Sequence, residues 1–567
     1  MLIAIKKQFD RFELYLLLII SAMALILRLW GIGFGLPYKY HIDEPPYVVA
    51  ALKLASGDLH ITYPYNSPNL FQFLLTLEYG GLFGVGLITG LFNSTADVAQ
   101  LYRTDPSAFF LLARITNSLL GCLTIILTYL LGKRLSGKAV SLFVALILAV
   151  SFALGRDAHY ATTDTLITLL VVGALLFTVA YSQSKLRRYI LIVGLLGGMA
   201  TGLKYLPASV LIPMTILILW RGKQQSQSVG RQLLSLGILG LGTAMGFLLA
   251  FPAILIGFDF FLTHWHQVTN QATSALGNFI VAPVPSWLFY AKIITWGMGW
   301  LVCIAAIVGV VLVTKRGFRN YWWILLLFGV LYYINISLMK TYFARYILPL
   351  LPVVGLLAAQ TIFDIYQFMR QHGVLSQHAL AITGGIIFLV CVEPAAALIR
   401  HDILLGKTDT RTLAKVWIEK NIPANTKIGL QWYGPPLSAR DDPETESTRT
   451  YTITILSPFT TLLNTDSLKT YRDSGVNYLI VNSWNKEFIH RDPAENEARQ
   501  RLYHQLEAEA TLVGTFDPTD DSINSTPEFF WEQIYGPATE LWKFQRPGPT
   551  IWIYQIESAK LTEKYPY

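Results

Sequence analysis

The stretch LYLLLIISAMALILRLWGIGFGLPYKYHIDEPPYVVAALKLASG, residues 14–57, joins a long apolar run directly to an acidic pair. Its apolar part, residues 14–34, is long enough to cross the hydrocarbon core of a membrane, which takes about 20 residues. Asp43 and Glu44 follow shortly after that run ends. Charges at this depth are costly and are seldom left without a partner or a task. The stretch therefore predicts a retained membrane helix that delivers two carboxylates to one membrane face.

The composition is that of a polytopic membrane protein. Of the 567 residues, 53% are hydrophobic and only 14% are charged, whereas soluble domains carry about 25% charge. The net charge of +8 comes from short basic clusters between apolar segments. That pattern is typical of cytoplasmic loops and does not indicate a nucleic-acid partner. The three cysteines all lie inside apolar runs, which argues against a disulfide framework or a thiolate zinc site.

The positive-inside rule fixes the topology. Besides 14–34, the candidate spans are residues 107–131, 138–155, 165–182, 189–203, 206–220, 233–257, 288–313, 321–338, 346–364 and 379–399. A further apolar stretch, 69–92, is ambiguous because it contains Glu78 and many glycines. If 69–92 does not cross, the basic loops all fall on the side of the N-terminus, the cytoplasm. We therefore predict about eleven spans, with 69–92 lying along the outer membrane surface in a large first loop, residues 36–105.

The sequence changes character near residue 400. Residues 401–567 are richer in charge and proline and have no long apolar run. The segment after Asp409 has helical spacing and ends at Pro423, with Asp409 as a candidate N-cap. TKIGLQW, TYTITIL, VNYLIVN and TIWIYQIE have the composition of strands. We predict a membrane domain at 1–400 and a C-terminal extracytoplasmic α/β domain at 401–567.

The acidic pair has two compatible interpretations. Asp43 and Glu44 can act as a base toward an acceptor hydroxyl or as metal ligands. They can also begin the next helix, whose first turn would hold Pro45 and Pro46. A helix-start position would hold a carboxylate rigidly, so neither interpretation excludes the other.

Two further polar groups are predicted to lie on the same outer face. The break GRDAHYATTDT, residues 155–165, contains Arg156, Asp157, His159 and Asp164. Asp164 is a candidate site residue or N-cap, and an Arg156–Asp157 surface pair is the simpler alternative. In LMKTYFARYILPLLP, basic groups at the membrane edge suit an anionic headgroup, although they can also reach toward lipid phosphates. The candidates there are Lys340, Tyr342 and Arg345, with Lys204 in a short outer turn as a similar case.

With these residues assembled, the chain resembles integral-membrane glycosyltransferases of the C superfamily (GT-C). The family 39 type is most similar, which comprises enzymes like protein O-mannosyltransferases and bacterial aminoarabinose–lipid A transferases. The resemblance covers roughly residues 14–365. It is carried by HIDEPPYVVAALKLASGDL, YNSPNLFQFL, ARITNSLLG, HYATTD, TGLKY and ARYILPLLP, in this order. The chain departs from the usual pattern at Ser67-Pro68-Asn69, where two prolines are expected.

The resemblance implies a sugar donor linked to polyprenyl phosphate and an inverting transfer to a protein, lipid or glycan acceptor outside the membrane. It implies Asp43 as the base, Glu44 as its support or as a residue that orients the acceptor, and Asp164 as a second acid. Lys340 and Arg345 would hold the donor phosphate, helped by Lys204 or Tyr342.

Several alternatives stay open at this point. Asp157, His159 and Arg156 are possible site residues, and a divalent metal on the carboxylates at 43, 44, 157 and 164 is possible. A transporter or flippase of lipid-linked sugars is the main alternative to an enzyme. Transporters place ionisable groups near the midplane, in repeated halves, whereas the charges here gather at one face and no repeat is visible.

Overall fold

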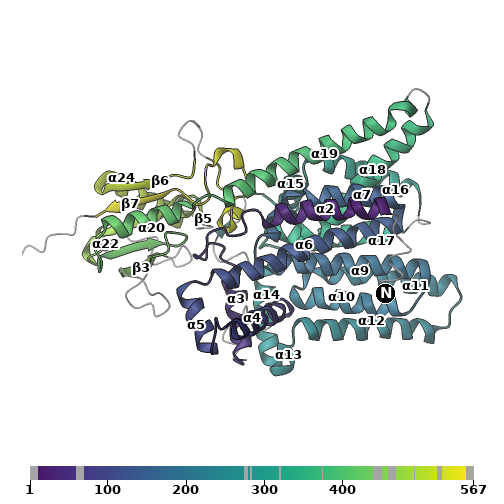
Figure 1. The fold of residues 1–567 in the computed structure, drawn as a ribbon, viewed down its shortest axis with the longest axis horizontal. Coiled ribbons are helices and arrows are strands. Elements are labelled where there is room, and N and C mark those ends of the chain that lie inside the picture. Colours follow the sequence, from purple (N-terminus) through teal and green to yellow (C-terminus); the bar gives the residue numbers. More distant parts are fainter. Residues whose placement is uncertain are drawn as a thin grey trace, which may run out of the picture.

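The computed structural model describes residues 11–58, 69–273, 279–280, 284–317, 321–372, 375–437, 450–456, 468–490, 492–519 and 527–556. Figure 1 shows a bundle of long helices joined to a smaller domain built around a sheet. This is the polytopic helical architecture with a C-terminal α/β domain that the sequence predicts.

The bundle consists mainly of long apolar helices. They are α2 (Arg11–Leu29), α6 (Ser107–Ser136), α7 (Lys138–Ala149), α8 (Phe152–Ala158), α9 (Asp164–Ser184), α10 (Arg188–Leu203), η2 (Leu206–Val210), α11 (Leu211–Gln224), α12 (Val229–Ala250), α15 (Ser286–Met298), α16 (Trp300–Lys315), α17 (Trp322–Ser337), η3 (Ala344–Leu350), α18 (Leu351–Gln371) and α19 (Leu375–Leu405). In the apolar windows of α9 and of η3–α18, 89% of the residues are buried. These two elements form the centre of the bundle, so a side chain at their ends has a rigid base.

The structure does not confirm the predicted count of eleven spans. Among the described residues, 8 helices are long and apolar enough to cross a membrane, or up to 10 if each bent pair counts as one span. Residues 288–313 are not one straight helix, because α15 and α16 meet at 114°. The bend lies at Gly299, whose φ of 84° ends α15, and the Glu393 carboxylate accepts a hydrogen bond from the Trp300 amide at the start of α16.

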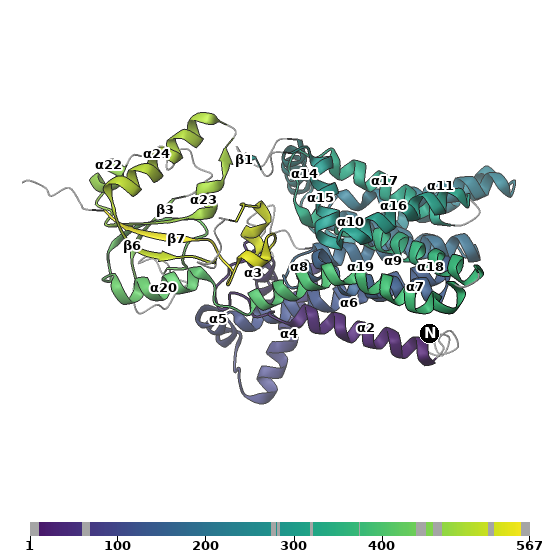
Figure 2. The same ribbon diagram turned by 90° about the horizontal axis from the view of Figure 1, so that it is seen from above.

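The first outer loop contains three helices. These are α3 (Glu44–Ala55), α4 (Leu70–Thr89) and α5 (Thr95–Thr104). By length and composition α4 qualifies as a span, yet Figure 2 shows it running across the direction of α2 and α6. That orientation is the one expected of a helix lying along a membrane surface. The short helices α13 (Ala253–Ile256) and α14 (Phe258–Thr273) lie near the same end of the bundle in Figure 1.

The two ends of the bundle have different neighbours. The α11–α12 and α18–α19 turns and the N-terminal end of α2 lie far from the C-terminal domain in Figures 1 and 2. The basic segments at 221–231 and 369–372 belong to these turns or to the helix ends beside them. These basic segments and the C-terminal domain therefore lie at opposite ends of the bundle.

The C-terminal domain is a three-layer α/β sandwich. Its sheet has the order β3-β2-β4-β7-β6, with β2 parallel to β3 and β4, and β7 antiparallel to β4 and β6. The strands are β2 (Lys427–Gln431), β3 (Thr452–Leu456), β4 (Tyr478–Asn482), β6 (Thr511–Phe516) and β7 (Ile551–Gln555). Four of them are the predicted strands, and β6 is an addition.

Strand alternation decides which helix covers which face of this sheet. Successive side chains of a strand point to opposite faces, so Leu479 and Val481 pack with α22 (Leu468–Asp473) and α24 (Pro493–Glu509). Ile480 packs on the other face with α20 (Thr410–Asn421). Asp409 caps α20 as predicted, because its side chain accepts a hydrogen bond from the Arg411 amide.

Two connections join the domain to the bundle. Helix α19 continues to Leu405, just beyond the predicted boundary, and leads into α20 after a short turn. The strand β1 (Phe279–Ile280) of the membrane part pairs with β5 (Ile489–His490) of the domain. The remaining short elements are α23 (Ser483–Glu487), η4 (Trp531–Tyr535) and η5 (Leu541–Lys543).

Candidate active site

Asp43 and Glu44 stand at the start of α3, as the Pro-Pro turn predicts. Asp43 is the N-cap residue of α3, but its side chain makes no cap hydrogen bond. It instead forms an ion pair with Arg345, with 3.0 Å between the carboxylate and Nη2. The Asp43 side chain is 32% exposed and is the more accessible partner. The local fold thus places this carboxylate at the surface of the bundle while its backbone is fixed by the helix.

Glu44 points the other way and is fully buried. Both of its oxygens lie 2.7 Å from the Arg114 guanidinium, and Oε1 also accepts a hydrogen bond from the Ala161 amide at 2.8 Å. Arg114 in turn donates to the carbonyls of Ile32 and Phe34. These contacts leave Glu44 no access to an acceptor. Of the two predicted roles, support of the base and orientation of the acceptor, this burial favours the first, which stays a prediction.

Asp164 joins the cluster from the first turn of α9. Its Oδ1 lies 2.5 Å from the Lys204 amine, and its Oδ2 lies 3.8 Å from the Arg345 Nε. Burial is the largest influence on the Lys204 amine and lowers its pKa, although the Asp164 charge acts in the opposite direction. Asp43, Asp164, Lys204 and Arg345 thus come from four different elements and form one cluster of two carboxylates and two cations.

Aromatic rings enclose the cations of this cluster. The Arg345 guanidinium lies 4.2 Å from the centre of the Phe343 ring and 4.5 Å from that of Tyr535. The Lys204 amine lies 5.0 Å from the Tyr346 ring centre. The faces of these rings attract cations, and their edges limit the positions of long side chains. Arg345 is consequently held in place, with only 12% of its side chain exposed.

The C-terminal domain contributes to this enclosure, which the sequence analysis did not anticipate. Tyr535 lies in η4, and the nearby Glu532 carboxylate accepts a hydrogen bond from the Ala344 amide at 2.6 Å. Burial and the Asp43 charge raise the pKa of the Tyr535 phenol well above its usual value. The available signal was the segment EFFWEQIYGP, residues 528–537, in which Glu532 stands among aromatic residues.

Arg156 contacts this segment, and both Arg156 and its neighbour Asp157 are buried. Arg156 donates hydrogen bonds to the backbone carbonyls of Glu532 and Pro537, at 2.9 and 3.1 Å. Its Nη1 lies 3.7 Å from the Asp157 carboxylate. The exposed surface pair that we considered for these two residues is therefore wrong, because both are almost fully buried. Arg156 anchors the C-terminal segment beside the cluster.

Lys340 and Tyr342 do not join the cluster. Lys340 is exposed in the bend after α17, and the described residues include no carboxylate in ion-pair contact with it. The Tyr342 hydroxyl donates a hydrogen bond to the Val284 carbonyl at 2.8 Å, and its ring packs on Phe289. The chain turns between α17 and η3, so only Arg345 of this motif reaches Asp43 and Asp164.

The carboxylates suggested as metal ligands face cations instead of one another. Asp43 pairs with Arg345, Glu44 with Arg114, Asp157 with Arg156, and Asp164 with Lys204. A divalent ion would have to displace these positive groups, so this set does not fit a metal.

A second group, His159, His401 and Asp402, brings three ligand atoms within 4.8 Å. The His159 ring nitrogens, however, already lie 2.8 Å from the Gly155 carbonyl and 3.0 Å from the Trp30 carbonyl. These contacts favour a hydrogen-bonded junction between α8 and α19 over a metal centre.

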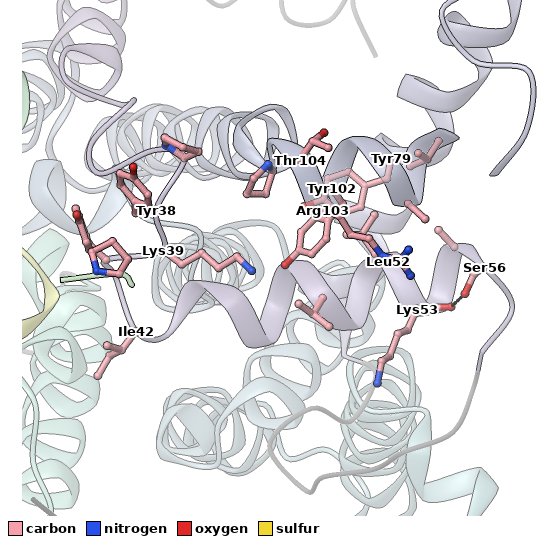
Figure 3. A pocket seen from close by; sticks show the side chains of 18 of the residues that line it. Tyr38, Lys39, Ile42, Leu52, Lys53, Ser56, Tyr79, Tyr102, Arg103 and Thr104 are labelled. Atoms are coloured by element: carbon pink, nitrogen blue, oxygen red, sulfur yellow. Dashed lines mark hydrogen bonds between the residues drawn. The ribbon is translucent and has the colours of Figure 1, made fainter. Parts of the chain in front are cut away.

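A cavity of about 950 Å³ opens beside the cluster. Ile42, which precedes Asp43, lines it together with parts of α3, α4 and α5. Tyr433 and its neighbours close it from the C-terminal domain. Figure 3 shows this space between α3 and the helices next to it.

Comparison with known proteins agrees with this architecture. Residues 110–241 match the dolichyl-phosphate-mannose-protein mannosyltransferase family. No curated protein matches the chain by sequence.

Two solved structures have a similar fold. The oligosaccharyltransferase AglB from Archaeoglobus fulgidus, in complex with an inhibitory peptide and a dolichol-phosphate, aligns with a TM-score of 0.52 and 10% identity, covering 96% of this chain and 88% of AglB. ArnT from Cupriavidus metallidurans, bound to undecaprenyl phosphate, aligns with a TM-score of 0.50 and 12% identity, covering 94% of this chain and 97% of ArnT. At such identities the likeness concerns the fold.

The family match and the fold make the chain similar to integral-membrane glycosyltransferases of the GT-C superfamily.

Proposed function

We propose that the chain is an inverting glycosyltransferase. It would transfer a sugar from a polyprenyl-phosphate donor to an acceptor hydroxyl at the membrane face that carries the C-terminal domain. The observation that carries the proposal is the cluster of Asp43, Asp164, Lys204 and Arg345, assembled from four distant stretches at one end of the bundle. The solved structures of AglB and ArnT, which hold a dolichol-phosphate and undecaprenyl phosphate, support the choice of donor class.

The two cations of the cluster suit the donor phosphate. A planar guanidinium offers paired N–H donors to phosphate oxygens, and an ammonium adds a compact charge. Arg345 and Lys204 are held by rings and carboxylates before any ligand binds. Such preorganised cations stabilise the negative charge that grows on a leaving phosphate. We assign phosphate binding to these two residues and not to Lys340.

Asp43 is the base in this proposal. The acceptor oxygen attacks the anomeric carbon, and its proton passes to the Asp43 carboxylate. The bond between the anomeric carbon and the phosphate oxygen breaks, and polyprenyl phosphate leaves with the bonding electrons. Attack from the side opposite the leaving group inverts the anomeric centre.

The ion pair between Asp43 and Arg345 would link donor binding to activation of the base. In the structure the guanidinium lies 3.0 Å from the Asp43 carboxylate. A donor phosphate would share the N–H groups of the fixed Arg345 guanidinium and so weaken its interaction with Asp43. The carboxylate would then be able to accept the acceptor proton.

This function suits a position in the plasma membrane. We propose that the basic loops lie in the cytoplasm with the N-terminus, as the positive-inside rule predicts. The C-terminal domain and the site would then face outward.

The test uses purified full-length protein in lipid nanodiscs with a panel of polyprenyl-phosphate sugars. Release of polyprenyl phosphate by the wild type is the expected result. Asp43→Asn should abolish release while the lipid donor still binds, and Arg345→Gln should weaken donor binding. Asp473→Asn and Arg501→Gln, at exposed positions of α22 and α24, are matched controls. Full activity of Asp43→Asn would refute the assignment of the base.

A further inference from the structure

The cavity beside Asp43 has an unusual charge. Among the residues that the structure describes, five basic side chains line it and no acidic one does. The basic residues are Lys39, Lys53, Arg103, Arg411 and Lys415. They come from the segment before α3, from α3 and α5, and from the C-terminal domain. The chain therefore gathers positive charge in one hollow from four places in the sequence.

Two of these cations form ion pairs with carboxylates, which compensate their charge. Arg411 makes a bidentate ion pair with Asp409, and Lys415 pairs with Glu419. Lys39 and Arg103, by contrast, are exposed, and no carboxylate lies within ion-pair distance of either in the part of the chain that the structure describes. Uncompensated charges that face a shared cavity attract an anionic ligand.

Tyrosines make up much of the remaining lining. Tyr38, Tyr79 and Tyr102 belong to the membrane part, and Tyr433 belongs to the domain. The Lys39 amine lies 4.9 Å from the Tyr102 ring centre, and Figure 3 shows the Lys39 side chain directed toward Tyr102. Flat rings that carry a hydroxyl offer an apolar face and a polar edge. Sugar rings match this combination, because they present C–H faces together with hydroxyl groups.

The cavity extends to neighbours of the proposed base, although Asp43 itself does not line it. Ile42 and Tyr433 line it, and Ile42 directly precedes Asp43. Tyr433 adopts a φ of 61°, which is uncommon for a residue with a side chain. Burial raises the pKa of the Tyr433 phenol, and the nearby charge of Asp43 adds to this effect. A ligand that fills the cavity would therefore end close to the carboxylate that takes the acceptor proton.

We propose that this cavity binds the acceptor and that the acceptor is an anionic saccharide, with sugar rings that carry phosphate or carboxylate groups. The assignment rests on the proposed function and adds the acceptor class to it. The headgroup of an anionic glycolipid and a soluble acidic glycan share this chemistry.

Binding is the readout, so that the test does not depend on catalysis. Purified full-length Asp43→Asn protein is titrated by calorimetry with trigalacturonic acid and, separately, with the neutral maltotriose. In a second arm, micelles containing phosphatidylinositol or phosphatidylcholine compete with trigalacturonic acid. The double variant Lys39→Gln/Arg103→Gln removes two cavity charges. Lys407→Gln/Lys420→Gln removes two exposed charges outside the cavity and is the matched control.

We expect the acidic probe to bind and the neutral probe to bind at least about tenfold more weakly, because the neutral probe forms no charge-assisted hydrogen bonds with the cavity cations. The cavity variant should lose that preference, and the control should keep it. If phosphatidylinositol competes and phosphatidylcholine does not, the anionic saccharide is a lipid headgroup. If neither lipid competes, it is a soluble glycan. Equal binding of both saccharides, no binding of the acidic one, or equal losses in both double variants would overturn the proposal. A wild type that transfers no sugar would refute the proposed function but leave this binding result standing.

Discussion

The adjacent acids Asp43 and Glu44 should respond in opposite ways to the same chemical change. Replacing each carboxylate by its amide keeps the shape and removes the charge. We expect Glu44→Gln to lower stability strongly, and Asp43→Asn to leave stability nearly unchanged while it abolishes transfer. Of these two neighbouring residues at one helix start, Glu44 would thus have a structural role and Asp43 a catalytic role.

The expected losses of stability follow from the burial of each carboxylate and from its ion-pair geometry. Glu44 and Arg114 are 0% and 1% exposed, and Glu44 also accepts the Ala161 amide. Removing one partner of such a buried pair costs about 3–5 kcal/mol, because the other charge stays buried without compensation. Asp43 is 32% exposed and makes one ion pair with Arg345, and pairs open to solvent contribute about 0–1 kcal/mol.

The assay is thermal unfolding in detergent micelles, followed by tryptophan fluorescence, beside the transfer assay. Glu44→Gln should lower Tm by several degrees and reduce the yield of folded protein. A double variant with Arg114→Gln as well should lose less stability than the sum of the two single changes, since no lone charge is then buried. A Glu44→Gln protein as stable as the wild type, or an Asp43→Asn protein equally destabilised, would refute this reasoning.

Two further predictions concern the C-terminal segment. Tyr535→Leu removes the ring 4.5 Å from the Arg345 guanidinium. Because a cation–π contact is worth about 0.5–2 kcal/mol, the donor KM should rise roughly 2- to 30-fold. Tyr535→Phe keeps a ring and should have a donor KM close to that of the wild type. Glu532→Ala leaves the buried Ala344 amide without its acceptor; it should cost about 1–3 kcal/mol, seen as a lower Tm, whereas Glu532→Gln keeps an acceptor oxygen and should cost less.

Local sequence patterns predicted much of this fold. The apolar runs, the Pro-Pro start of α3, the Asp409 cap and four strands of the C-terminal sheet all depend on short-range spacing. The bend between α15 and α16 escaped prediction. Hydropathy measures length and polarity, and a single glycine inside an apolar run changes neither. Strand β6 was missed because only its packing on β7 distinguishes it from a loop.

The site was predictable where topology alone decides proximity. Asp43, Asp164 and Arg345 meet because the predicted number of membrane crossings between them places all three at the same end of the bundle. Lys340 and Arg345 are five positions apart, yet only Arg345 reaches the acids, because the bend after α17 turns Lys340 to the surface. The opposite fates of Asp43 and Glu44 depend on Arg114, which lies 70 residues further along the chain. No spacing rule predicts such a partner.

The C-terminal domain belongs physically to the site. Arg345 would have one open face without Tyr535, and the Ala344 amide would have no acceptor without Glu532. Arg156 is buried under this segment and donates to two of its carbonyls, so a chain cut near residue 400 would leave a guanidinium without those partners in the membrane part. The same domain supplies Tyr433 to the cavity beside Asp43. Residues 1–400 alone therefore lack two groups that fix Arg345, the proposed phosphate-binding cation, and the domain that supplies them also shapes the space where the proposed acceptor would enter.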